Sequence, residues 1–265
     1  MDALKAFSAS QIAWVSQSPS AQQQSVQYST SALSGLRQAV GQFNNTNADS
    51  VLATTCILVS QSKDWLSWSS FLGGINSIAA IIESRQQDSI YSDNIKRINA
   101  CWARQAASRT IDHFNFQRGE LLSRINRSLQ QLRAHFGTRP VEIYWIDQCL
   151  YLIQCLQTID PANTVEDQFN HLIVLRRLVF WLPAYLLHDG SIDMLKLSVV
   201  MHLYAVALAL EPFFPGLSAE LYGDNAAPAL LHGLDRMKAM QPEMHSSNST
   251  PLMQFPDAIL AEFNA

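Results

Sequence analysis

Three polar side chains lie within apolar helical stretches and could take part in acid–base chemistry. They are Asp147 in YWIDQCLYL, His188 in LLHDG and His202 in MHLYAV. A positioned carboxylate or imidazole can act as a general acid or base. Buried polar groups, however, are normally held by hydrogen bonds within the core. We therefore expect a structural role for each of the three, with ligand contact or proton transfer as the alternative.

Known catalytic and metal-binding motifs are missing from the sequence. It has no phosphate-binding Gly-rich loop, no His-Glu-x-x-His, no Gly-x-Ser-x-Gly and no Asp-Asp-x-x-Asp run. The four cysteines, Cys56, Cys101, Cys149 and Cys155, form no Cys-x-x-Cys pair and have no metal-ligand spacing with histidine. We predict buried free thiols in a reducing compartment, no catalytic residue, no metal and no cofactor.

The composition predicts a large apolar core and argues against two classes of partner. Hydrophobic residues make up 48% of the 265 residues and charged residues 15%, against about 25% charged residues in ordinary domains. The net charge is −4 and the 18 basic residues form no dense cluster, so direct nucleic-acid binding is not expected. The most apolar run, 197–210, is shorter than the roughly 20 residues of a membrane span. It therefore predicts a core helix, and we expect no transmembrane segment.

The spacing of apolar residues is helical almost throughout. No strand-length alternation and no repeat of fixed period occurs. The sequence predicts an all-α, single-core helical bundle of about nine to eleven helices over residues 1–240. A loose tail over 241–265 follows, in which 256–263 could form a short helix. The polar stretch 83–93 is the only candidate boundary, but both of its flanks are rich in core residues. The predicted helices cover 1–18, 20–43, 47–61, 64–82, 94–136 with a weak point at 112–119, 141–159, 165–188, 191–210 and 228–240. Ser20 is the predicted cap of the second helix. Helical spacing places two sets of apolar residues on single inner faces: Leu4, Phe7, Trp14 and Val15 in the first helix, and a seam of Leu122, Ile125, Leu129, Leu132 and Phe136 in the second half of the 94–136 helix.

The fourth predicted helix carries the densest aromatic pattern. It follows the polar joint Ser62-Lys63-Asp64, and Asp64 is a suitable N-cap. One continuous stripe then recurs at spacings of three and four residues. Its members are Trp65, Trp68, Leu72, Ile75, Ala79 and Ile82.

Aromatic and apolar residues at helical spacing belong mainly to the core, and some could line a pocket between helices. A ligand with a hydroxyl group would need one polar contact, for which His202, Tyr204 and Ser69 are candidates. We predict that an apolar ligand inserts between the fourth helix and the 194–210 helix. The predicted contacts are Trp65, Trp68, Phe71, Leu72, Ile75, Met201, His202 and Tyr204.

Three blocks in the same order resemble a known family. Residues 3–19 contain a Gln-x-Ala-Trp element at Gln11 to Trp14, and residues 29–75 contain a Gly-Leu pair, NADSVLA and Trp-x-x-Trp after an acidic residue. Residues 204–223 contain LEPFFP. These blocks resemble the C-terminal effector domain of fungal Zn2Cys6 zinc-cluster transcription factors, especially the regulators of sterol uptake.

The resemblance implies an all-α regulatory domain that follows an N-terminal DNA-binding zinc cluster. In sterol-sensing members it binds ergosterol in a hydrophobic pocket, and sterol depletion moves the protein from cytoplasm to nucleus. Other relatives control secondary-metabolite gene clusters. This chain lacks the six cysteines of the zinc cluster. It is either a fragment or a stand-alone relative, which could form a homodimer or pair with a full-length regulator.

These features together predict the effector domain of a fungal transcription regulator, acting in nucleus and cytoplasm. It would respond to a hydrophobic ligand such as a sterol, or control a secondary-metabolite gene cluster. The enzymatic alternative is a cyclase or pericyclase that orients an apolar intermediate, with Asp147, His188 or His202 as acid or base. A third reading is a purely structural interaction module.

Overall fold

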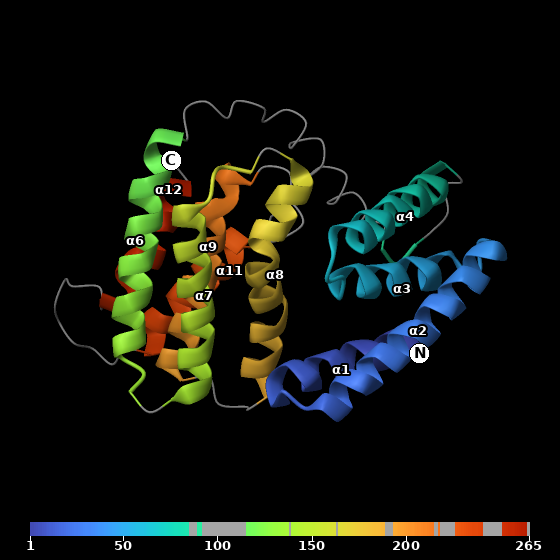
Figure 1. Ribbon diagram of the computed structural model, residues 1–265, viewed down its shortest axis with the longest axis horizontal. Helices are drawn as coiled ribbons and strands as arrows, with labels where there is room; N and C mark the ends of the chain where they lie inside the picture. Colours follow the sequence, from blue (N-terminus) through green and yellow to red (C-terminus); the bar gives the residue numbers. More distant parts are fainter. Residues whose placement is uncertain are drawn as a thin grey trace. The chain divides into compact units, whose positions relative to one another are not determined.

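The computed structural model describes residues 1–84, 89–91, 115–137, 139–162, 164–188, 193–214, 217, 226–240 and 251–263. These residues form ten α-helices and one 3₁₀ turn, and none of them belongs to a strand (Figure 1). The predicted all-α class is confirmed. The first half of the predicted 94–136 helix, with Cys101, Trp102, Arg104 and Arg109, lies outside the described residues, as does 241–250.

The contacts divide the chain into two compact units, 1–97 and 98–265. The sequence analysis treats 1–240 as one domain with one core, and the contacts differ from that expectation. The division follows the polar stretch 83–93. Apolar residues on both sides of this stretch show that each flank is buried. They do not show that the two flanks are buried against each other.

The first unit contains four helices. They are α1 (Asp2–Ser16), α2 (Pro19–Gly41), α3 (Ala48–Ser60) and α4 (Trp65–Ser84). Gln17 adopts a left-handed conformation at the end of α1, and the Ser18 hydroxyl accepts a hydrogen bond from the Ala21 amide at the start of α2. Pro19 takes the first helical position, where the missing amide hydrogen costs nothing. The cap is thus Ser18, two residues before the predicted Ser20.

Helix α1 buries its alanines rather than its large apolar residues. Ala3, Ala6, Ala9 and Ala13 are at most 6% exposed, whereas Leu4 is 55% exposed. The prediction that Leu4 belongs to the inner face is therefore wrong, and Phe7 and Trp14 of the same predicted face are only half-buried. Small side chains let the axes of α1 and α2 approach closely, and this packing competes with burial of the larger residues.

Helix α4 begins as predicted. The Asp64 carboxylate accepts a hydrogen bond of 2.8 Å from the Ser67 amide, which caps the helix. This bond, together with one from the Ser67 hydroxyl, lowers the pKa of Asp64. Trp68, Ile75, Ala79 and Ile82 of the predicted stripe are buried. Of these, Ile75, Ala79 and Ile82 pack against Val51 and Leu52 of α3 in one buried cluster.

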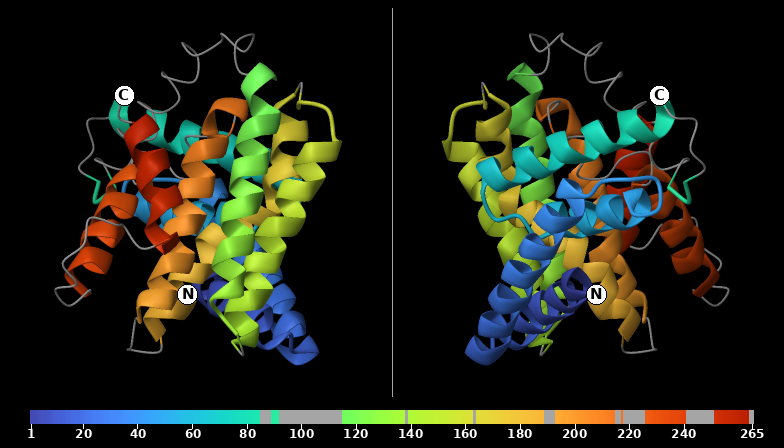
Figure 2. Two further views of the ribbon diagram at one scale, coloured as in Figure 1. Left: turned by 90° about the vertical axis from the view of Figure 1, so that its left-hand side faces the viewer. Right: turned by 90° about the vertical axis from the view of Figure 1, so that its right-hand side faces the viewer.

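The second unit is built around one largely buried helix, α9 (Met194–Leu210). Between Leu197 and Leu210 every residue except Tyr204 is buried. The surrounding helices are α6 (Asn115–Ala134), α7 (Pro140–Thr158), α8 (Val165–His188), α11 (Ala226–Met240) and α12 (Pro251–Phe263), all of which contact α9 (Figure 2). A 3₁₀ turn, η1 (Glu211–Phe213), ends α9.

Two predictions for this unit have different outcomes. The seam of the second half of the predicted 94–136 helix is confirmed, since its members are at most 2% exposed. They are Leu122, Ile125, Leu129, Leu132 and Phe136. Helix α12, in contrast, begins at Pro251 and contains Pro256, which was expected to start it.

Within the part of the chain that the structure describes, two stretches are long and apolar enough to cross a membrane, Trp65–Ser84 and Met194–Phe213. Core helices of soluble proteins have the same length and composition. About two thirds of the second stretch (67%) is buried within its unit. This extent of burial is typical of a core helix.

Candidate functional site

The eight residues predicted to contact a ligand divide between the two units. Trp65, Trp68, Phe71, Leu72 and Ile75 lie on α4 of the first unit. Met201, His202 and Tyr204 lie on α9 of the second unit. Each group is therefore considered within its own unit.

The α4 group packs the core of the first unit. Trp68 and Ile75 are 3% exposed, and the Trp65 and Trp68 rings lie 5.1 Å apart at a tilt of 34°. Ile75 belongs to a buried cluster with Val51 and Leu52 of α3. Phe71 packs against a separate cluster of Ala3, Ala32 and Leu58. These contacts account for the aromatic pattern by packing.

The three residues of the α9 group lie in different surroundings. Met201 lies against Gly233 of α11, so close that a Cβ atom at Gly233 would be 1.8 Å from the methionine sulfur. Tyr204 is half-buried, and burial raises the pKa of its hydroxyl. Of the three, His202 lines a cavity in the centre of the unit.

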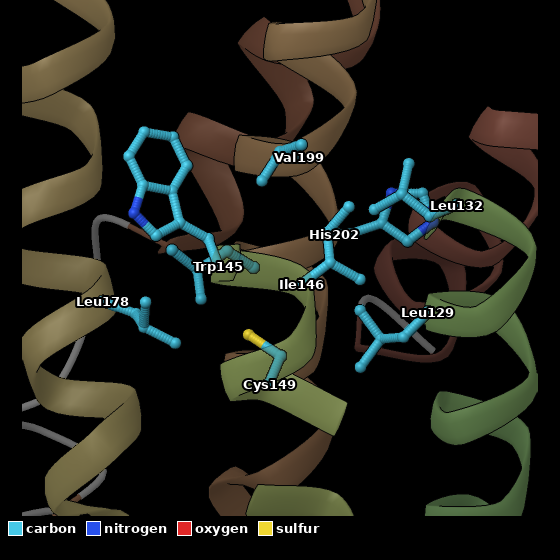
Figure 3. A pocket seen from close by; sticks show the side chains of 9 residues that line it. Leu129, Leu132, Trp145, Ile146, Cys149, Leu178, Val199 and His202 are labelled. Atoms are coloured by element: carbon cyan, nitrogen blue, oxygen red, sulfur yellow. The ribbon is translucent and has the colours of Figure 1, made fainter. Parts of the chain in front are cut away.

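The cavity lies where α6, α7, α8 and α9 meet (Figure 3). It has a volume of about 10 Å³, counted as the space open to the centre of a water molecule, which corresponds to roughly one water site. His202 is the one strongly polar side chain in an otherwise apolar lining. The other lining residues are Leu129, Leu132, Trp145, Ile146, Cys149, Leu178, Val199 and Leu203.

The hydrogen bonds of His202 define its neutral form. Its Nδ1 lies 2.8 Å from the carbonyl oxygen of Ser198 and must donate to it, because a carbonyl only accepts. In the neutral ring Nε2 is then an acceptor, and the Ser128 hydroxyl donates to it over 3.2 Å. Desolvation lowers the pKa of His202 to about 4, although the Ser198 carbonyl favours the charged form. His202 thus joins α9 to α6 as an uncharged hydrogen-bonding residue.

The cavity as it stands offers little reactive chemistry. An imidazole with a pKa of about 4 is a weak base at neutral pH. Burial also raises the pKa of the Cys149 thiol to about 12, so it is not a nucleophilic thiolate. Cys56, Cys149 and Cys155 are all free thiols.

The other two candidate acid–base residues do not join His202 in the described structure. Asp147 forms an ion pair with Arg133 at the surface, with 2.6 Å between its oxygen and Arg133 Nε. Its side chain is 41% exposed, and it is not among the residues that line the cavity. The side chain of His188 lies outside the described residues.

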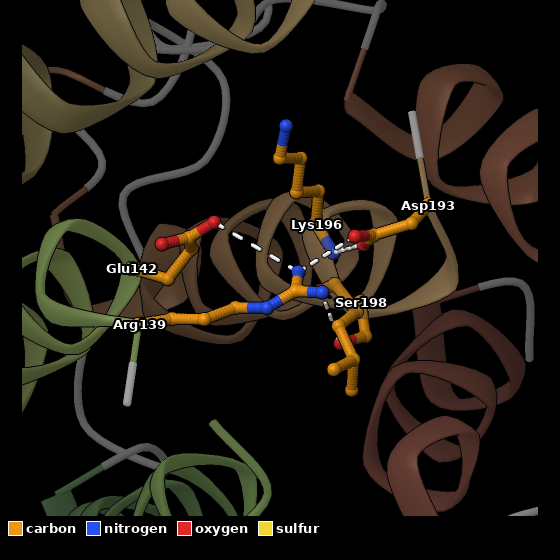
Figure 4. Close-up of polar contacts among 6 residues, drawn as sticks. Arg139, Glu142, Asp193, Lys196 and Ser198 are labelled. Carbon is orange, nitrogen blue, oxygen red and sulfur yellow. Dashed lines mark hydrogen bonds and ion pairs between the residues drawn. The ribbon is translucent and has the colours of Figure 1, made fainter. Parts of the chain in front are cut away.

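A polar cluster that was not predicted from the sequence lies at one end of the second unit (Figure 4). Arg139 precedes α7 and donates to the Asp193 carboxylate over 2.6 Å, and it also lies 4.0 Å from Glu142. Asp193 caps α9 by accepting a hydrogen bond of 2.8 Å from the Lys196 amide. Arg139 thereby connects the first turns of two helices. The sequence did contain a signal for the cap, though not for the ion pair: Asp193 lies three residues before Lys196, at the start of an apolar run.

Asp193 is predicted to stabilise the second unit mainly through the α9 cap. Desolvation alone would raise its pKa, but the Lys196 amide and Arg139 outweigh desolvation and lower it. We expect Asp193→Ala to reduce the free energy of unfolding by about 1–2 kcal/mol, because both cap and ion pair are lost.

Asp193→Asn is the matched control, since the amide oxygen still accepts from Lys196 and only the charge is removed. In urea unfolding, Asp193→Asn should lose less than half as much free energy of unfolding as Asp193→Ala loses. Equal losses in the two variants would contradict the cap as the dominant contribution.

No group of three histidine, cysteine, aspartate or glutamate residues could hold a metal ion within the described ranges. No family model matches the chain, and no curated protein or solved structure is significantly similar to it.

Proposed function

We propose that the chain is the effector domain of a fungal-type transcription regulator, which acts by binding and carries out no reaction. The observation that carries this proposal is the ordered series of motifs over residues 3–19, 29–75 and 204–223. Each motif alone is moderately specific, and their common order strengthens the resemblance. Regulation in nucleus and cytoplasm, and pairing with a second regulator chain, are parts of the same proposal.

Motif residues in the described part of the chain make contacts that define helix ends. Asn47 accepts from the Asn44 amide and donates to the Ala39 carbonyl, which closes the turn between α2 and α3. Asp49 accepts from the Ser89 hydroxyl over 2.6 Å. Glu211-Pro212-Phe213 forms the turn that ends α9. The roles of these residues are compatible with a scaffold that serves binding.

The regulatory ligand in this proposal is a small apolar molecule, such as a sterol, that enters the second unit near His202. The supporting features are an apolar lining and one hydrogen-bonding side chain, as in typical ligand pockets. The cavity has room for about one water molecule. A sterol would therefore bind only a conformation in which α6, α7, α8 and α9 lie further apart. It would shift the population from the closed to this open conformation by its higher affinity for the open one.

The ligand part is tested by titrating the purified chain with a fluorescent sterol and measuring energy transfer from tryptophan. We expect saturable binding. Leu178→Phe adds bulk at the cavity and should weaken sterol affinity about ten-fold, which equals roughly 1.4 kcal/mol. Leu231→Phe places the same substitution at a position that is 49% exposed and should leave affinity unchanged. Lack of saturable binding would remove the sterol from the proposal.

The regulatory part has its own test, a deletion of the gene followed by transcript measurement. Loss of transcripts from one set of genes, in particular sterol-uptake or secondary-metabolite genes, is the expected result. Normal transcripts with an accumulating pathway intermediate would contradict regulation and would favour a cyclase or pericyclase.

A further inference from the structure

Helix α12 packs against α9, α11 and α6 (Figure 2), and the surface that these three helices present to it is called the groove below. One side of α12 is buried in this groove, whereas Gln254, Ala258 and Glu262 on its opposite side are exposed. The buried side chains are Pro256 and five hydrophobic residues that are each at most 9% exposed, namely Leu252, Met253, Phe255, Ile259 and Leu260. This is the pattern by which an amphipathic helix lies in a hydrophobic groove.

The groove recognises α12 by one aromatic contact and two basic residues at its rim. The Phe255 ring stacks on the imidazole of His202, with 5.9 Å between centroids and 27° between planes. Arg124 of α6 lies 2.8 Å from the Glu262 carboxylate, and Lys238 of α11 lies 3.7 Å from Asp257. The groove therefore fits a helix with apolar residues on one side and acidic residues at its flanks.

The sequence of α12 is a poor one for holding this position. Pro256 lies inside the helix, where it removes the hydrogen bond that position 256 would donate to Leu252 and disfavours the helical backbone. A helix of 13 residues is marginal in water even without proline. Most of the stability of α12 must come from the groove. A helix of the same pattern with an apolar helix-forming residue in place of the buried Pro256 would therefore bind the groove better.

We propose that the groove between α6, α9 and α11 is a docking site for an acidic amphipathic helix of a partner protein, and that α12 is the built-in occupant that such a helix replaces. A second copy of this chain is a weaker occupant, since its α12 contains the same proline. The proposal goes beyond the effector function above and does not depend on it.

The probe is a fluorescein-labelled peptide with the sequence of residues 251–263, in which Pro256→Ala restores the helix. Its binding to the full chain is measured by fluorescence anisotropy. Phe255→Ala in the chain weakens the built-in competitor, so the probe should bind this variant about ten-fold more tightly than wild type. Phe263→Ala is the matched control, because Phe263 lies on the same helix and is 51% exposed. Equal probe affinity for the two variants would overturn the proposal.

A charge exchange separates groove binding from non-specific binding and also works if Phe255→Ala fails to fold. Arg124→Glu in the otherwise wild-type chain removes the ion pair of α12 and that of the probe alike, so it should leave the affinity of the original probe nearly unchanged. A probe that also carries Glu262→Arg should bind this variant about two- to five-fold more tightly than the original probe does, since it alone regains the exposed pair. Equal affinity of the two probes for Arg124→Glu would contradict the groove as the site. Light scattering that shows dimers of the wild-type chain which the probe converts to monomers would contradict the partner helix and assign the groove to a second copy.

Discussion

Gly233→Val is expected to destabilise the second unit by about 3 kcal/mol, since overpacking of a filled core costs typically 1–3 kcal/mol and sometimes more. Even a Cβ atom at this position would lie 1.8 Å from Sδ and 2.3 Å from Cε of Met201. Met201 is 2% exposed, so its side chain can make room for valine only by displacing its own buried neighbours. The measurement is the free energy of unfolding in urea.

The control for Gly233→Val is Gly119→Val on α6, where nothing lies within 4 Å of an added Cβ. It introduces the same residue into a helix of the same unit, and we expect little loss of stability. Met201→Ala should restore part of the stability of Gly233→Val, although Met201→Ala alone leaves a cavity. A coupling energy near zero in this double-mutant cycle would show that the two side chains do not compete for one space.

Acidification from pH 7 to pH 4 should remove about 3 kcal/mol of stability through His202 alone, since each unit of pKa difference corresponds to roughly 1.4 kcal/mol. The imidazole has a pKa near 6.5 when unfolded and about 4 in the folded chain, where desolvation disfavours its charged form. Below pH 6.5 the unfolded chain takes up a proton that the folded chain does not. The contribution of neutral His202 to the free energy of unfolding is therefore fully present above pH 6.5, and it is lost as the pH falls toward 4.

His202→Gln isolates this effect, because glutamine can hydrogen-bond and does not titrate. The groups that pack around His202 are Ser128, Leu129 and Leu132 of α6, Trp145, Ile146 and Cys149 of α7, Leu178 of α8 and Phe255 of α12. None of these carries a charge between pH 4 and pH 7. Urea unfolding at both pH values should show a smaller acid loss in the variant. Parallel pH curves for wild type and variant would contradict a buried neutral histidine.

Helix positions followed from the sequence wherever periodicity coincided with chemical end signals. Asp64 and the seam from Leu122 to Phe136 are examples, because a local cap and a single buried face suffice to define them. The α1 face was mispredicted, because hydrophobicity favours Leu4 whereas close helix approach favours alanine. Pro256 was taken for a helix start because local propensity does not include the groove that holds α12.

The polar contacts of the second unit could not be predicted from the sequence. The eight predicted ligand contacts lie on helices of different units and stay a prediction. His202 was recognised as a buried polar residue, whereas its partner Ser128 lies 74 positions away in the sequence. No local pattern encodes such a pair. The Arg139–Asp193 contact was missed for the same reason.

The enclosure of α9 has a consequence for how the second unit gains its stability. A helix buried on every side has no favourable surroundings until α6, α7, α8, α11 and α12 have assembled around it. Its backbone amides should therefore exchange with deuterium only through global opening of the unit, at the slowest rate in the unit. Its neighbours come from both earlier and later parts of the sequence. During folding, burial of α9 therefore requires contacts between segments that are far apart in the chain.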